Sequence, residues 1–160
     1  MQTEHSSSPA RVLEVLRRMG YDVSILEFRE PTRTAEEAAR RAGCSIGQIV
    51  KSLVFRGAAT GKAVLVLTSG ANRVDEQGMA VHIGEAIKRA DPEFVLSATG
   101  FAIGGVPPVG HTQTIESYLD EDLLQFESVW ASAGAENAIF SISPSSLRSM
   151  TNARVVRVKP

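Results

Sequence analysis

The chain has 160 residues, of which 43% are hydrophobic and 22% charged, and its net charge is −1. This composition fits one globular domain with an apolar core and excludes a chain that is disordered throughout. No apolar run approaches the roughly 18 residues of a membrane-spanning helix, and the single cysteine, Cys44, rules out an internal disulfide. The polar residues 1–8 lack the apolar centre of a signal peptide. We therefore expect a loose leader over residues 1–8, one domain over residues 9–160, and a cytoplasmic protein that contacts no membrane.

The first half of the chain alternates helices with strands. Ser8 and Pro9 are suited to start a helix, and Thr34 with Glu37 has the spacing of a capping box. Two apolar runs separated by a glycine-bounded turn are expected to pair as a hairpin. The predicted elements are a helix over 9–19, a strand over 21–28, a helix over 34–43, a short turn over 45–48, and strands over 49–55 and 63–67.

The second half contains two further helix starts, in which a capping residue precedes a proline at Asp91 and at Ser143. The predicted elements are a short helix from residue 75, helices over 84–90 and 91–100, strands over 126–132 and 138–142, a helix over 143–150, and a strand over 153–158. This order predicts a mixed α/β domain with a largely antiparallel sheet flanked by helices.

Several common catalytic motifs are absent from the sequence. It has neither the G-x-x-x-x-G-K-[ST] phosphate loop nor the G-x-S-x-G turn of the α/β-hydrolases. The three histidines, His5, His82 and His111, lack the spacing of metal ligands. We therefore expect neither a metal site nor a Walker-type nucleotide site.

A glycine- and proline-rich loop over residues 104–110 is the most unusual segment. Its glycines permit positive φ and close backbone approach, and its two prolines stiffen it without donating hydrogen bonds. Free N–H groups in such a loop can bind an anion or an oxyanion, although a purely structural turn is the alternative. The candidate N–H donors are those of Gly105, Val106, Val109, Gly110 and His111.

Lys51 lies inside an apolar predicted strand, where an ammonium group is costly unless it is paired or faces a cleft. At a cleft it could hold a phosphate or polarise an ester carbonyl. The alternative is an ordinary outward lysine with a buried stem and a solvated tip.

Four segments in order resemble the YbaK/EbsC/ProX superfamily of free-standing trans-editing factors and of editing domains in bacterial prolyl-tRNA synthetases. The resemblance covers roughly residues 9–157 and rests on residues 49–55, 72–75, 104–110, and 129–134 with 142–147. It implies a curved, partly barrel-like sheet and hydrolysis of aminoacyl-tRNA that carries the wrong amino acid, without a metal or cofactor.

The resemblance also implies the residues of the site. The family's strand lysine falls on Lys51, its motif proline on Pro108, and its late glycine on Gly134. Pro107 and the segment from His111 depart from the Cys-tRNA(Pro) deacylase branch, so the reaction is better supported than cysteine as the substrate. The expected catalytic residues are Lys51, Gly104, Gly105, Val106, Pro108 and Gly110, and the expected substrate-binding residues are Ser52, Pro107, Val109, His111 and Gly134.

The distribution of charged residues along the sequence bears on whether the protein binds RNA. Residues 91–147 hold eight acidic residues and no Lys or Arg, whereas residues 148–160 hold four basic residues and no acidic ones. A protein that binds a long stretch of nucleic acid usually has a strong excess of basic residues. If this protein binds RNA, we therefore expect it to contact only a short piece. From the charges alone, the simpler explanation is that acidic and basic residues are separated by chance on solvent-exposed faces.

We thus expect a metal-independent aminoacyl-tRNA deacylase, in which water attacks the ester at the tRNA 3′ end and loop N–H groups stabilise the oxyanion. An aminoacyl-tRNA synthetase is a second candidate partner, and a monomer or weak homodimer is expected. Two alternatives are a non-catalytic module that binds a tRNA end or a synthetase, and a small-molecule esterase that uses the same loop.

Overall fold

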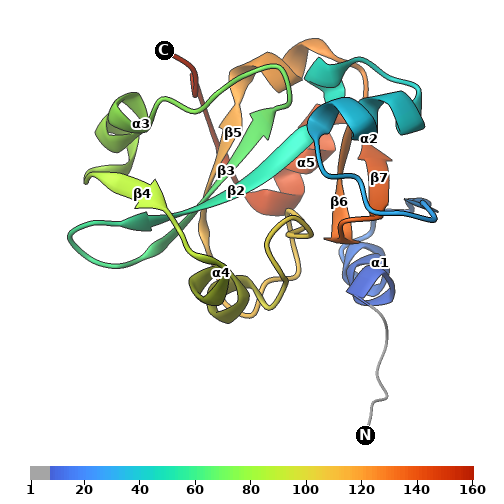
Figure 1. Ribbon diagram of the computed structural model, residues 1–160, viewed down its shortest axis with the longest axis horizontal. Helices are drawn as coiled ribbons and strands as arrows, with labels where there is room; N and C mark the ends of the chain where they lie inside the picture. Colours follow the sequence, from blue (N-terminus) through green and yellow to red (C-terminus); the bar gives the residue numbers. More distant parts are fainter. Residues whose placement is uncertain (1–7) are drawn as a thin grey trace, which may run out of the picture.

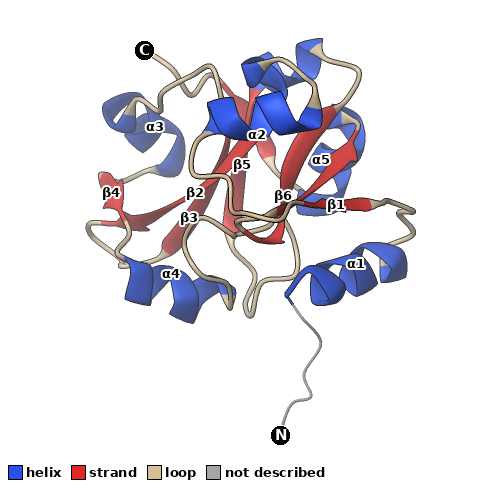
Figure 2. Cartoon of the chain, turned by 45° about the vertical axis from the view of Figure 1, so that its right-hand side comes forward, coloured by secondary structure: helices blue, strands red, loops and turns tan. Residues whose placement is uncertain are grey.

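The computed structural model describes residues 8–160, so the predicted leader lies outside the described residues except for Ser8, which belongs to the first helix. The described part contains two β-sheets with helices packed around them (Figures 1 and 2). The helices are α1 (Ser8–Arg18), α2 (Ala35–Ala42), α3 (Glu76–Ile83), α4 (Pro92–Thr99) and α5 (Pro144–Thr151), with short 3-10 turns at Ile46–Gln48 and Glu121–Gln125. None of the described helices has the length and hydropathy needed to cross a bilayer.

The larger sheet has the strand order β4-β2-β3-β5-β8. Its members are β4 (Ile87–Arg89), β2 (Val50–Gly57), β3 (Ala63–Ser69), β5 (Glu116–Asp120) and β8 (Arg154–Val156). The predicted hairpin is confirmed, because β2 and β3 pair antiparallel along their whole length. The strands β5 and β8 extend the sheet in parallel.

The smaller sheet is antiparallel, with β7 (Ala138–Ile142) between β1 (Ile25–Glu27) and β6 (Val129–Ala135). One parallel bridge between Ile49 and Trp130 joins the two sheets. The mixed, largely antiparallel α/β architecture is therefore confirmed, but the sheets do not close into a barrel.

Capping residues fix three helix starts as predicted. The Thr34 hydroxyl accepts a hydrogen bond from the N–H of Glu37, and Asp91 and Ser143 cap α4 and α5 in the same way. These bonds satisfy N–H groups that have no partner within the helix, which explains why the local sequence was sufficient to place these helices.

The structure differs from the predicted elements at three places. The predicted helix over 84–90 is wrong, because Gly84 ends α3 at a positive φ of 94° and the following residues form β4, in which Arg89 pairs with Phe55 of β2. The strand β5 was not predicted, because its residues 116–120 alternate polar and apolar types too weakly to stand out from a loop. The predicted strand over 21–28 is shortened to β1.

A buried carboxylate connects the end of β5 to the loop after β3. Asp120 is 1% exposed and accepts hydrogen bonds from the N–H of Ser69, the side-chain amide of Asn72 and the N–H of Asp122 at 2.8–3.0 Å. Asn72 also donates to Asp122, which forms an ion pair with Lys159. These bonds determine where the backbone of Asn72 lies.

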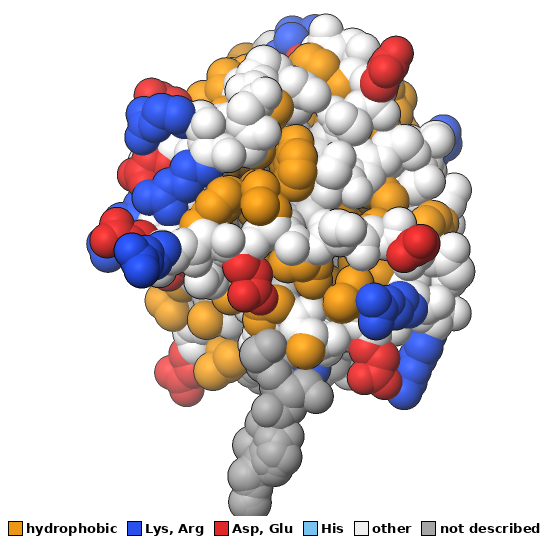
Figure 3. Space-filling model, turned by 90° about the vertical axis from the view of Figure 1, so that its right-hand side faces the viewer, with side chains coloured by type: hydrophobic (Ala, Val, Ile, Leu, Met, Phe, Trp, Pro, Cys, Tyr) orange, Lys and Arg blue, Asp and Glu red, His pale blue; other side chains and the backbone are white. Residues whose placement is uncertain are grey.

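The face seen in Figure 3, over α1, α2 and the smaller sheet, mixes basic and acidic side chains with hydrophobic ones. On this face, therefore, no one-signed charged surface is available for a long stretch of nucleic acid.

Candidate functional site

A cavity of about 280 Å³ lies along an uncovered edge of β2. The strand β6 pairs with Ile49, the residue just before β2, whereas β4 pairs with β2 only from Phe55 to Gly57. The five residues between these points, 50–54, all line the cavity, so it occupies the gap where β6 and β4 diverge from β2. Its other walls come from the start of α2, from α4, and from the glycine-proline loop. The lining includes Lys51, Ser52, Gly104, Val106, Ser132 and Glu136.

The glycine-proline loop reaches the cavity with its first half. Gly104 has a φ of 89°, and the N–H groups of Gly104 and Val106 donate to no acceptor within residues 8–160. Gly105 is different, because its N–H donates to the carbonyl of Ala102 at 3.0 Å. Its prediction as a free donor is therefore wrong. A Cβ at Gly105 would come within 2.9 Å of the Ala135 backbone, so this glycine permits close packing of the loop on β6.

The second half of the loop does not border the cavity. Pro108, Val109, Gly110 and His111 line a separate hollow, and none of them borders the cavity. Gly134 is also outside it, because its ideal Cβ position is 3.0 Å from the Ser8 carbonyl oxygen in α1. The predicted site residues are thus divided. Lys51, Ser52, Gly104 and Val106 lie together at the cavity, Pro108, Val109, Gly110 and His111 line the separate hollow, and Gly134 packs against α1.

His111 holds the loop through a hydrogen bond between its Nε2 and the carbonyl oxygen of Pro107, at 2.7 Å. Burial lowers the pKa of His111, and the bond to Pro107 offsets part of this shift. The folded-state pKa is therefore below the unfolded value of about 6.5. The neutral ring contributes stability that is complete above this unfolded pKa and is lost as the pH falls toward the folded one.

We therefore expect the free energy of unfolding to decrease as the pH falls below about 6.5, and to decrease less steeply in His111→Gln. Urea unfolding across this range measures the slope. His82→Gln is the matched control, because His82 lies on α3 and borders neither the cavity nor the hollow that the loop lines. If His111→Gln leaves the slope unchanged, His111 does not titrate in this way.

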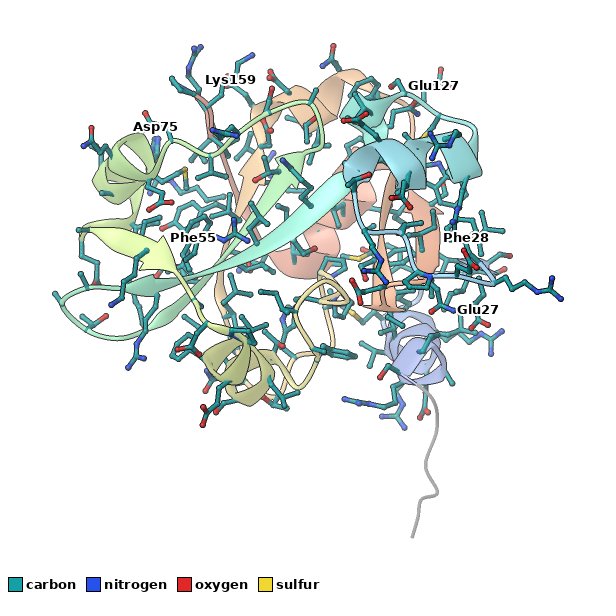
Figure 4. All side chains as sticks on the ribbon, viewed as in Figure 1. Glu27, Phe28, Phe55, Asp75, Glu127 and Lys159 are labelled. Atoms are coloured by element: carbon teal, nitrogen blue, oxygen red, sulfur yellow. The ribbon has the colours of Figure 1, made fainter. Side chains whose placement is uncertain are left out.

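Lys51 lies at the junction of the cavity with a second, larger hollow of about 590 Å³. Strand alternation places Lys51 on the same face as Phe55, which lies on the α3 side of the sheet (Figure 4). Its Nζ donates to the carbonyl oxygen of Asn72 at 2.8 Å. Both depressions share Lys51, Leu53 and Arg89, so they are continuous around the edge of β2.

The second hollow is electropositive near Lys51. Burial lowers the pKa of Lys51, Arg89 and Arg73 lower it further, and Asp120 acts in the opposite direction. Both arginines line the hollow, and neither forms an ion pair within residues 8–160. One acidic residue, Glu76, also borders it. Three neighbouring cations without a paired carboxylate favour an anionic ligand.

Sequence reasoning missed four residues of these depressions. Arg73 and Arg89 come from a loop and from a segment predicted as helical, and only the folded chain brings them beside Lys51. Ser132 was detectable as a polar residue between the buried Ala131 and Ala133. Glu136 lies in the turn after β6, where its carbonyl oxygen accepts two hydrogen bonds from Thr32.

No group of three or more His, Cys, Asp and Glu side chains within residues 8–160 is arranged to hold a metal ion. The polar groups of the residues that line the cavity are hydroxyls, backbone N–H groups, the Lys51 ammonium, the guanidinium groups of Arg33 and Arg89, and one carboxylate, that of Glu136. Such groups can bind and polarise a carbonyl or an anion.

Comparisons with known proteins identify the family of the chain. The model of the family described as "Aminoacyl-tRNA editing domain" matches residues 29–150. The uncharacterized protein YwhH of Bacillus subtilis is 32% identical over 131 residues, which are 82% of this chain and 83% of YwhH. EbsC of Enterococcus faecalis, a "Putative Cys-tRNA(Pro)/Cys-tRNA(Cys) deacylase", is 25% identical over 98% of this chain and 95% of its own.

The same likeness extends to a solved structure, that of "a putative trans-editing enzyme for prolyl tRNA synthetase". It superposes with a TM-score of 0.92 at 46% sequence identity, over 97% of this chain and 98% of the other. The predicted resemblance is confirmed, and the chain belongs to the aminoacyl-tRNA editing domain family.

Proposed function

We propose that the protein hydrolyses the ester bond of mischarged aminoacyl-tRNA. The observation that carries this proposal is the continuity of a small cavity, lined by the loop, with a hollow lined by Lys51, Arg73 and Arg89. An aminoacyl-tRNA end has the matching parts, because a small acyl group is attached to a ribose and followed by phosphates. A small uncharged ester would leave the three cations without a ligand.

In the proposed reaction the aminoacyl group occupies the cavity and its carbonyl oxygen faces the N–H groups of Gly104 and Val106. Water adds to the carbonyl carbon, and the loop stabilises the negative charge that develops on oxygen. The ester C–O bond then breaks, releasing the amino acid and the ribose hydroxyl. The proton lost by the water is transferred to the leaving oxygen with the help of the neighbouring ribose hydroxyl, while Lys51 holds the ribose-phosphate.

A deacylation panel tests the proposal. Wild-type protein is incubated with tRNAs charged with cognate and non-cognate amino acids, and release of the amino acid is measured. We expect at least one mischarged tRNA to be deacylated well above the spontaneous rate. Retained tRNA binding without any deacylation would indicate a non-catalytic module, and equally fast turnover of minimal esters would indicate a general esterase.

Gly104→Ala tests the part assigned to the loop. Alanine at a φ of 89° is strained by about 1–2 kcal/mol, so we expect the loop to shift and turnover to fall about tenfold or more. Gly84→Ala is the matched control, because Gly84 has a φ of 94° with no atom within 4 Å of its Cβ position, and it lies outside the cavity. Equal deacylation rates for the two variants would remove the loop from the mechanism.

A further inference from the structure

The main chain of β2 points alternately toward β3 and toward the cavity. In an antiparallel pair, the N–H and C=O of one residue point to the same edge of the strand, and successive residues alternate between the two edges. The C=O of Ile49 accepts a hydrogen bond at 2.7 Å from Gly70, which follows β3. The C=O of Val54 accepts one at 3.1 Å from Ala90, which follows β4. The main-chain groups of Ser52 therefore point to the same edge as those of Val54, which is the edge that borders the cavity.

Ser52 occupies the middle of this edge and has no partner strand there. The bridge at Ile49 lies three residues before it, and the bond at Val54 lies two residues after it. In the described part of the chain, neither a strand pair nor a hydrogen bond outside the strands reaches the main chain of Ser52 from this side. A half-buried backbone group without a partner is costly. One free N–H and one free C=O at a cavity favour a ligand that supplies one acceptor and one donor.

An aminoacyl group carries this pair of groups, because its α-ammonium donates and its carbonyl oxygen accepts. The gap in the edge has room for one such residue, since Val54 is already bonded to Ala90. The cavity volume of about 280 Å³ is at the lower limit for ligand pockets, which suits a single amino acid. The carboxylate of Glu136, whose side chain lies beside Gly104 at the cavity, offers a second partner to the ammonium.

We infer that the aminoacyl group pairs with the main chain of Ser52 as one residue of an added strand. The C=O of Ser52 accepts a hydrogen bond from the α-ammonium, and its N–H donates one to the ester carbonyl oxygen. This inference rests on the proposed function and deepens it, because Ser52 then supplies a third N–H to the developing oxyanion, beside those of Gly104 and Val106.

The pairing selects the handedness of the amino acid. Two residues that exchange both bonds in an antiparallel pair have their side chains on the same face of the sheet. An L-amino acid therefore directs its side chain to the face of Ser52 and Val54. On this face Val54 packs in one apolar cluster with Val95 and Val106, and all three line the cavity. A D-amino acid that makes the same two bonds directs its side chain to the opposite face, that of Lys51.

The test measures binding of amide-linked L-alanyl- and D-alanyl-aminoadenosine to the wild-type protein by calorimetry. The two analogues carry the same ammonium, carbonyl and methyl groups, so they differ only in the direction of the methyl group when both bonds to Ser52 are made. The D-analogue must give up one of these bonds to place its methyl group against the apolar cluster. We therefore expect the L-analogue to bind about tenfold or more tightly.

Ser52→Pro tests the main-chain bond itself. It removes the N–H that points to the cavity and no bond between β2 and β3, and proline is tolerated in a strand where its missing N–H has no ladder partner. Ser52→Ala is the matched reference, because it lacks the same hydroxyl and keeps the N–H. We expect Ser52→Pro to bind the L-alanyl analogue about tenfold more weakly than Ser52→Ala. Thermal unfolding checks that both variants are folded.

Equal affinity of the wild-type protein for the two enantiomers, including binding of neither, would overturn the inference. Equal affinity of the folded Ser52→Pro and Ser52→Ala variants for the L-analogue would also overturn it. If Ser52→Pro does not fold, the comparison of enantiomers on the wild type decides. These measurements need no turnover, so they are separate from the proposed function. Failure of every ester in the deacylation panel would reject the reaction while a preference for the L-analogue still supports the pairing.

Discussion

Lys51→Ala is expected to lower kcat/KM for deacylation by about 10²-fold or more while the protein stays folded. The ammonium group is held by the Asn72 carbonyl, which occupies one of its three N–H bonds and leaves two for the substrate. Stability should change little, because the side chain is only half-buried and its charge is repelled by Arg89 and Arg73. Deacylation assays together with thermal unfolding measure both effects.

Two further variants make this result interpretable. Lys51→Arg should restore only part of the activity, because a planar guanidinium cannot reproduce the directions of a compact ammonium. Lys88→Ala removes an exposed cation of β4 that lines neither depression and should behave like wild type. Near-normal deacylation by Lys51→Ala would eliminate Lys51 from the mechanism.

Asp120→Ala is expected to lower the free energy of unfolding by about 2–4 kcal/mol. The substitution removes the acceptor of three hydrogen bonds from a site that is 1% exposed, and leaves the N–H groups of Ser69 and Asp122 without this partner. Because Asn72 also loses its bond to Asp120, the carbonyl that holds Lys51 should shift and deacylation should fall as well. Urea unfolding and the deacylation assay measure the two consequences.

Asp122→Ala is the control for this prediction. Asp122 also accepts a hydrogen bond from Asn72, but its ion pair with Lys159 is partly exposed to solvent, so its loss should cost only about 1 kcal/mol. If Asp120→Ala unfolds at the same urea concentration as the wild type, the buried carboxylate does not stabilise the end of β5.

Local signals explain which parts of the fold could be predicted. Thr34, Asp91 and Ser143 cap their helices with bonds inside the same four residues, so the sequence alone identifies them. The strand β4 was mistaken for a helix because its conformation is imposed by pairing with β2, which is some thirty residues away in sequence. The strand β5 is likewise held between β3 and β8, and nothing within its own residues determines that position.

The same distinction between local signals and long-range contacts applies to the residues of the candidate site. Lys51 could be identified because an ammonium group in an apolar strand is unusual by itself. Arg73 and Arg89 could not, since each is an ordinary exposed residue until the sheet brings both beside Lys51. Gly105 illustrates a partial success: the need for glycine was recognised, but the reason is close contact with the Ala135 backbone and not a free N–H group.

Lys51 and Ser52 are consecutive residues of β2, and consecutive side chains of a strand point to opposite faces. One peptide unit therefore separates the ammonium group that faces the cationic hollow from the hydroxyl on the opposite face of β2. A single-residue insertion or deletion before Lys51 in β2 would reverse this assignment and exchange the faces of the ammonium and the hydroxyl. Changes of length in this strand can be tolerated only in steps of two, so substrate preference in this chain can diversify by substitution of the side chains and not by altering the length of β2.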